Sequence, residues 1–149
     1  MIFSFMLFNR YGSCVFFEEW NRTRKVNMVE MKTNMYGLVF EMKRFIIKTS
    51  PTGKTPEYFA YTTNVYKMHC FETASGKRFI LVTDPSVGDL KEELRKIYST
   101  IFVEYVIKNP LFKIRNSETS AFEESLKECE LFTSELHKYL QSLPCWSSA

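Results

Sequence analysis

The chain has 149 residues, of which 45% are hydrophobic and 16% aromatic, and its formal net charge is +3. This length predicts a single domain over residues 1–149, and the low content of Gly and Pro excludes a largely disordered chain. Basic and acidic residues are interspersed, without the basic block typical of nucleic-acid binding, so we expect no nucleic-acid partner. The four cysteines have no zinc-ligand spacing, and we expect them to be reduced and buried.

The chain opens with the apolar run MIFSFMLF. This run is too short to span a bilayer and has no basic residues before it, so we expect a strand in a cytosolic protein, without a transmembrane segment. A second strand-like run, Ser13–Trp20, follows Ile2–Phe8 after the turn sequence NRYG. The two runs predict a β-hairpin.

From about Met28 to Thr49 the hydrophobic period becomes helical. The apolar stripe expected to face the sheet consists of Met28, Met31, Met35, Leu38, Met42, Phe45 and Ile46. The stretch SPTGKTP then ends the helix. It is similar to the end of a phosphate-binding loop, but Lys48 stands where that loop requires a glycine, five positions before Gly53. We therefore interpret it as a solvated turn.

Three further strands are predicted at Glu57–Thr63, Tyr66–Thr73 and Lys77–Asp84. Their short connections favour an antiparallel meander. The last strand is apolar on both faces from Phe79 to Val82, which is typical of a strand covered on both sides of its sheet.

Two helices are expected after the strands. The first starts near Leu90, becomes apolar nearly all round in IFVEYVIKN, and ends before Asn109-Pro110. The second is predicted over Ser120–Ser142, with Ser120 and Glu123 spaced as a capping box. Its inner stripe would be Phe122, Leu126, Cys129, Leu136, Leu140 and Leu143. This order predicts an α/β (α+β type) fold, a five-stranded antiparallel sheet with one helix on one face and two on the other.

The residues His69 and Cys70 stand side by side in the fourth strand. Neighbouring strand side chains point to opposite faces, so these two cannot act as a base and a nucleophile on one substrate. The same alternation separates Glu18 from Glu19, and His137 has no metal-ligand spacing to His69. We expect no catalytic residue, no cofactor and no metal.

A second apolar stripe is expected on the outer side of the first helix. It consists of Tyr36, Phe40 and Ile47, flanked by the basic residues Lys43 and Arg44. If this helix alone covers one face of the sheet, the stripe faces water. Scattered exposed apolar residues are common, but aligned aromatic and aliphatic side chains beside basic residues are typical of protein interfaces. These five residues are the candidate protein interface.

Five collinear blocks of the sequence carry a family resemblance. They are LFNRYGSCVFFEEW, MYGLVFEMKRFIIKTSP, YKMHCFETASGKRFILVTD, IYSTIFVEYVIKNPL and LHKYLQSLP. Together they closely resemble the subunit 1 family of TRAPP, the transport protein particle, over most of the chain. That family has the longin, or SNARE-like, fold, whose order of elements agrees with the order predicted above.

The resemblance implies a non-catalytic core subunit of a cytoplasmic tethering complex, peripheral at the cis-Golgi and endoplasmic reticulum. Its implied partners are other TRAPP subunits, including a second longin-type subunit, and, through the complex, a Rab-family GTPase. The implied function is to help form the surface that promotes GDP release from the GTPase in transport from the endoplasmic reticulum to the Golgi. The segment 115–130 is longer than in the family pattern and the linker NRTRKVN is shorter, so we carry no family contacts over to them.

Two alternatives remain open at this point. The first is another longin-type trafficking subunit, such as a sedlin-like or a small adaptor-coat subunit, which would share the fold but bind different neighbours. The second is a small enzyme that uses Cys70 or His69. Co-purification from cytosol would separate the two binding functions, and a thiol-blocking assay would test the enzyme.

Overall fold

The computed structural model describes residues 1–21, 24–109, 126 and 129–146. Its elements are β1 (Ile2–Phe8), β2 (Cys14–Glu19), α1 (Met28–Thr49), β3 (Tyr58–Thr62), β4 (Lys67–Glu72), β5 (Arg78–Thr83), α2 (Lys91–Lys96), the π-helix η1 (Ile97–Ile107) and α4 (Glu130–Ser142). The five predicted strands are confirmed, and four of them are one residue shorter at each end than the sequence indicated.

The five strands form one antiparallel sheet in the order β2-β1-β5-β4-β3. The opening hairpin and the β3-β4-β5 meander are therefore both confirmed. The first and last strands along the chain meet in the middle of the sheet, where Phe5 of β1 lies opposite Leu81 of β5.

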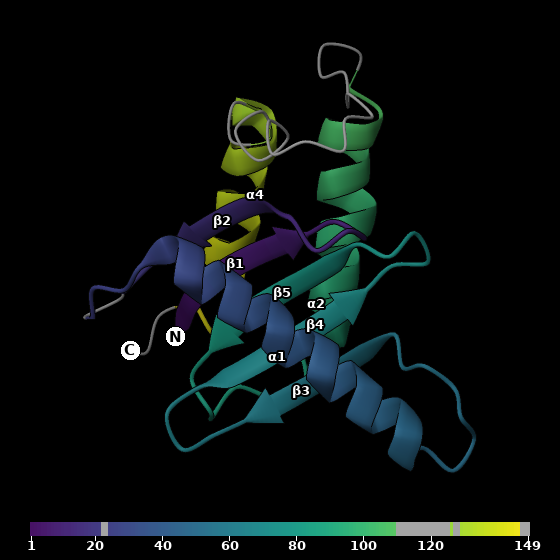
Figure 1. Cartoon of the computed structure of the whole chain (residues 1–149). Coiled ribbons are helices and arrows are strands. Elements are labelled where there is room, and N and C mark those ends of the chain that lie inside the picture. Colours follow the sequence, from purple (N-terminus) through teal and green to yellow (C-terminus); the bar gives the residue numbers. More distant parts are fainter. Residues whose placement is uncertain (22–23, 110–125, 127–128, 147–149) are drawn as a thin grey trace.

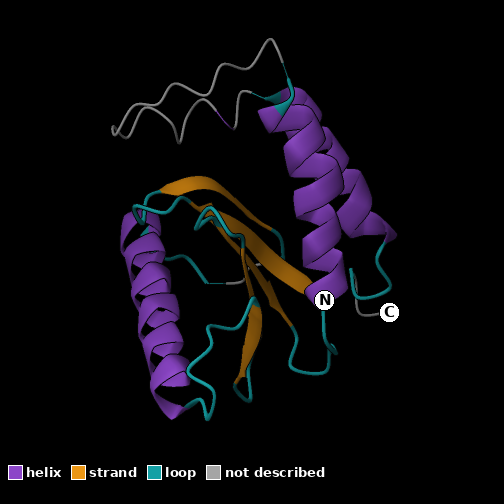
Figure 2. Cartoon of the chain, turned by 90° about the vertical axis from the view of Figure 1, so that its right-hand side faces the viewer, coloured by secondary structure: helices purple, strands orange, loops and turns teal. Residues whose placement is uncertain are grey.

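Helices cover both faces of this sheet, with α1 on one side and α2, η1 and α4 on the other (Figure 1, Figure 2). The side chains of β5 divide between the two layers. Phe79 and Leu81 belong to the core beneath η1 and α4, whereas Ile80 and Val82 belong to the core beneath α1. This arrangement confirms the doubly covered last strand and the predicted longin-type architecture.

The helix α1 has the predicted bounds, and local chemistry explains both of its ends. At the start, the Asn27 side chain accepts hydrogen bonds from the backbone N–H groups of Val29 (3.1 Å) and Glu30 (3.5 Å). At the other end, Ser50 is extended, as expected for a residue that precedes a proline.

The helix after β5 differs from the prediction in its winding. Six residues of α-helix, α2, pass directly into η1, where the Lys108 N–H donates to the Val103 carbonyl five residues earlier (2.9 Å). The sequence could not predict this change, because a segment that is apolar nearly all round has no periodic stripe that would report the residues per turn.

The last helix, α4, begins at Glu130 in the described part of the chain. The predicted capping box, Ser120 with Glu123, and the predicted core residue Phe122 lie outside the described residues. Of the other stripe residues, Leu126, Leu136 and Leu140 are fully buried and Cys129 is 7% exposed, as the sequence indicated, whereas Leu143, just after the end of the helix, is only partly buried.

Candidate protein-interaction face on α1

The orientation of α1 on the sheet is set by Val39, the one residue of this helix that is completely buried. The buried stripe predicted from the sequence is centred elsewhere on the helix and does not include Val39. Phe45, assigned there to the core, has 63% of its surface exposed. At about 100° per residue Phe45 lies roughly 120° around the helix from Val39, so the assignment of Phe45 to the core is wrong.

Two of the five candidate interface residues turn toward the sheet. The Tyr36 ring packs against Phe8, with centroids 5.7 Å apart, and the Arg78 guanidinium lies 5.2 Å from its centroid. Lys43 forms an ion pair with Glu72 (Nζ to Oε1, 2.6 Å). The expectation that the stripe faces water is therefore wrong for Tyr36, and the flanking Lys43 also points toward the sheet, because the helix is rotated toward this flank.

The other three candidates lie farther from the sheet. Phe40 is 41% exposed and stacks on the Tyr36 ring, with centroids 6.3 Å apart. Arg44 is exposed and lies 3.6 Å from the Glu41 carboxylate, and Ile47 is partly buried. The five residues thus lie along one flank of α1 and differ in how far they are exposed. Phe40 packs on Tyr36 with one side of its ring and is exposed to solvent on the other.

This flank continues toward the start of α1, beyond the predicted residues. Val29 is 74% exposed and lies seven residues before Tyr36, which places it on the same side of the helix. A groove of about 270 Å³ runs between Val29 and Tyr36 and the β1–β2 turn. The spacing of Val29 to Tyr36 was the sequence signal for this extension, and the predicted stripe did not include Val29.

The turn that borders the groove requires a glycine. Gly12 has φ +90°, and a Cβ atom at this position would lie 2.7 Å from the Tyr36 ring. The β1–β2 turn therefore approaches α1 closely enough to hold Tyr36 against the sheet. This long-range contact could not be predicted from the sequence pattern.

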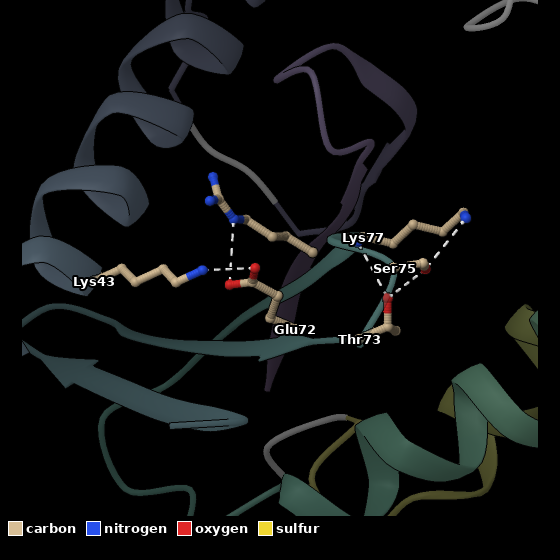
Figure 3. Close-up of polar contacts among 6 residues, drawn as sticks. Lys43, Glu72, Thr73, Ser75 and Lys77 are labelled. Carbon is tan, nitrogen blue, oxygen red and sulfur yellow. Dashed lines mark hydrogen bonds and ion pairs between the residues drawn. The ribbon is translucent and has the colours of Figure 1, made fainter. Parts of the chain in front are cut away.

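An ion-pair cluster fixes the same flank of α1 to the β4–β5 hairpin (Figure 3). Glu72 and Arg78 are cross-strand partners at the end of that hairpin, and the Arg78 Nε lies 3.6 Å from the Glu72 Oε2. Lys43 approaches the other carboxylate oxygen from the helix. All three side chains are less than a quarter exposed, so the single carboxylate balances two cations in a largely dry environment.

The residues considered for an enzyme have structural roles. The Cys70 side chain is 1% exposed in the core beneath α1, and burial raises the pKa of its thiol to about 12. A thiol held neutral in this way is a poor nucleophile. His69 has no exposed surface and faces the opposite layer, so the predicted divergence of the two side chains is confirmed.

His69 is part of a buried hydrogen-bond chain. Its Nδ1 lies 2.7 Å from the Tyr58 hydroxyl and its Nε2 lies 3.0 Å from the Thr83 hydroxyl, which donates in turn to the Asp84 carbonyl (3.1 Å). Tyr58 donating to Nδ1 and Nε2–H donating to Thr83 requires a neutral ring. Burial, followed by the charge of Lys67, lowers the pKa of His69 to about 4, in agreement with that assignment.

Among the described residues, no group of three or more His, Cys, Asp or Glu side chains is arranged to hold a metal ion. In the same part of the chain, every helix is too short or too polar to cross a membrane.

Comparisons with known proteins give a consistent result. The Sybindin-like family model matches residues 2–143. Trafficking protein particle complex subunit 1 of Dictyostelium discoideum is 38% identical, over 99% of this chain and all of the relative. The human protein of the same name is 35% identical over 95% of this chain and 93% of its own length. Transport protein particle subunit bet5 of Schizosaccharomyces pombe is 28% identical over 97% of this chain and 99% of its own. Since the family match extends from β1 through α4 and the relatives align along nearly their whole lengths, the chain belongs to the Sybindin-like family.

Proposed function

We propose that this chain is a core subunit of a TRAPP-type trafficking particle, with a structural role and no catalytic group of its own. The observation that supports this most strongly is the end-to-end match to relatives named as subunit 1 of such a particle. Because the match includes every element of the fold, it favours a chain that occupies the same position in the assembly as these relatives. A protein that shared only their fold would not be expected to match so completely.

Within the particle, the chain helps to form the surface that binds a Rab-family GTPase and promotes its GDP release in transport from the endoplasmic reticulum to the Golgi. It acts in the cytoplasm, peripheral at the cis-Golgi and endoplasmic reticulum, beside a second longin-type subunit. The resemblance of the sequence to the subunit 1 family supports this finer assignment.

The flank of α1 is the part of this chain that we assign to partner binding. Phe40, Arg44 and Ile47 provide an exposed aromatic ring, a cation and an aliphatic group on one helix, a composition favoured at protein interfaces. Tyr36 and Lys43 support this surface indirectly. Their contacts with Phe8 and Glu72 fix the rotation of the helix on the sheet. Phe40 is thus presented on a rigid base, which lowers the entropy cost of binding.

The test is reconstitution of the particle from purified subunits, with and without this chain. Release of a fluorescent GDP analogue from the Rab-family GTPase is expected with the complete particle, and only background release is expected with the chain alone or with the particle that lacks it. Exchange by the isolated chain at micromolar concentration would contradict the proposal, as would full exchange without it.

Purification of the native complex tests the competing assignment. Mass spectrometry of proteins that co-purify with the chain should identify the TRAPP subunits. Recovery of adaptor-coat subunits in their place would favour the alternative longin-type function.

A further inference from the structure

The turns β1–β2 and β4–β5 meet at one end of the sheet. Gly76 has φ +84°, and a Cβ atom at this position would lie 2.9 Å from the Cβ of Arg10. No side chain separates the two turns, so Arg10 of one turn and Lys77 of the other belong to the same small surface.

Neither cation has a carboxylate partner in the part of the chain that the structure describes. Glu72 lies close in the sequence, but its carboxylate faces α1 and is shared by Lys43 and Arg78. The Lys77 side chain extends away from Glu72 (Figure 3). In agreement, the pKa of Lys77 is lowered, first by burial and then by the positive charge of Arg10. Within the described residues, two cations therefore lie near each other without a carboxylate to balance them.

The two side chains are also held in place. The Lys77 ammonium lies 5.8 Å from the centroid of the Phe102 ring and 3.5 Å from the Ser75 hydroxyl, and its backbone N–H donates to the Thr73 hydroxyl (3.1 Å). The Arg10 guanidinium donates to the Tyr11 hydroxyl (2.6 Å). The Lys77 ammonium is thus partly desolvated and its contacts with Phe102 and Ser75 are with neutral groups, so an anion from a partner would gain more from it than from a fully solvated lysine.

Tyr11 indicates what carries the anion. Tyr11 is 64% exposed, with the Arg10 guanidinium 4.9 Å from its ring centroid, and exposed Tyr with Arg is the composition enriched at protein interfaces. Membrane surfaces are typically recognised by about four to eight clustered basic residues, and nucleic acids by longer basic stripes. A pair of cations beside one aromatic ring fits a short acidic peptide segment better than either.

We propose that Arg10, Tyr11 and Lys77 form a docking site for an acidic segment of a partner protein. Carboxylates of the partner lie between the Arg10 guanidinium and the Lys77 ammonium, within reach of the Ser75 hydroxyl, and an apolar group of the partner covers the Tyr11 ring. The site does not depend on the assignment of α1, because it is built from the two turns.

The first test uses the full chain and a capped tetraglutamate peptide as the probe. Amide NMR shifts on titration are expected around Arg10 to Ser13 and Thr73 to Lys77, with affinity that falls as NaCl is raised. Lys77→Met, which keeps the aliphatic stem, and Arg10→Gln should each weaken binding about tenfold, as expected for the loss of a charge-assisted hydrogen bond. Lys54→Gln, in an exposed turn elsewhere, is the matched control and should bind normally.

Thermal unfolding of the same variants separates binding from stability. Lys77→Met should melt at the same temperature as the wild type or higher, because it removes an uncompensated charge from a partly buried position. The proposal is overturned if Lys77→Met binds the peptide normally, if it melts clearly lower, or if a tetraglutamine peptide binds equally well.

The second test identifies the partner class in the assembled particle. A photoreactive amino acid at position 11 is expected to crosslink to a peptide rich in Asp and Glu, with a lower yield when Lys77→Met is also present. Crosslinking to lipid, to nucleic acid or to a peptide without acidic residues would overturn the proposal, as would the absence of any adduct.

Discussion

The two faces of the sheet are packed by different means. Beneath η1 and α4, aromatic rings interlock at centroid distances of 5.2 Å for Phe16 with Phe132, 5.5 Å for Phe79 with Phe102 and 6.2 Å for Phe102 with Phe132. Beneath α1, the core includes the thioethers of Met6 and Met68, and a partly buried ion pair links the helix to the sheet. A cleft of about 430 Å³ also opens between the first half of α1 and the sheet.

This difference implies that one face chiefly stabilises the fold, whereas the other has exposed side chains that can contact a partner. A face covered by two neighbouring helices buries almost all its apolar surface, so its residues chiefly stabilise the fold. A single helix covers a narrower strip, which leaves its flanks exposed, as Phe40 and Phe45 show. Mutations on the two faces should therefore affect different measurements.

The largest effect is expected for Phe132→Ala. Phe132 is fully buried between Phe16 and Phe102, and its removal leaves a cavity in the tightly packed layer. The free energy of unfolding should fall by about 4 kcal/mol, measured by urea denaturation. The neighbouring Leu131→Ala, at a 55% exposed position, is the control and should change little. If the two variants lost the same free energy of unfolding, the buried side of α4 would not be packed more tightly than its exposed side.

Mild acid should act on the same face through His69. The unfolded chain takes up a proton at this residue near pH 6.5, whereas the folded chain keeps a pKa of about 4. The stabilising effect of the neutral ring is therefore fully present above pH 6.5 and is lost as the pH falls from 6.5 toward 4. The loss should reach about 2 kcal/mol at pH 5, since each pKa unit is worth about 1.4 kcal/mol.

Denaturation curves at pH 7 and pH 5 give this quantity for the wild type and for His69→Gln. The variant should lose less stability on acidification, although it will be less stable at pH 7. An identical pH dependence in the two proteins would show that His69 titrates normally.

On the α1 face, Glu72→Gln should cost about 1–2 kcal/mol. The change leaves Lys43 and Arg78 as neighbouring cations without a counter-charge, and the partial exposure of the cluster keeps the cost below that of a fully buried pair. Glu41→Gln, which affects only the exposed pair with Arg44, is the control and should leave the unfolding midpoint nearly unchanged. A fall in stability that disappears in high salt would indicate a purely surface interaction.

The smallest effect on stability is expected for Phe40→Asp, within about 0.5 kcal/mol, together with a loss of about 2 kcal/mol or more in binding. Phe45→Asp, on the opposite exposed flank, serves as a matched control. Thermal unfolding, capture of the TRAPP subunits and binding to the nucleotide-free GTPase should be compared for both variants. If Phe40→Asp folds and binds every partner normally, the flank is ordinary exposed apolar surface.

Local patterns predicted most of the elements, because strand alternation, helical periodicity and the proline positions are short-range signals. The rotation of α1 about its axis could not be predicted in this way. This helix is apolar on the Val39 side and on both flanks, so several stripes satisfy the same periodicity, and the choice between Val39 and Phe45 depends on contacts with the sheet.

The candidate site shows the same limit. The helical spacing showed that its residues share one side of α1. Their contacts could not be predicted, because Tyr36 packs against the turn at Gly12 and Lys43 pairs with Glu72, both far away in the sequence. Glu72 and Arg78 have opposite charges and flank the β4–β5 turn, so the sequence already indicated that they form a cross-strand pair. Their third partner on α1 could be found only from the structure.

The central pairing of β1 with β5 also has a consequence for synthesis on the ribosome. The first hairpin and α1 emerge well before β5, so the nascent chain has a strand edge and apolar side chains that only later residues can cover. A chain arrested before Arg78 should therefore remain sensitive to protease and bind chaperones, and resistance should begin only once β5 and the helices after it have left the exit tunnel. The risk of aggregation is therefore greatest at that early stage of synthesis, before β5 can pair with β1.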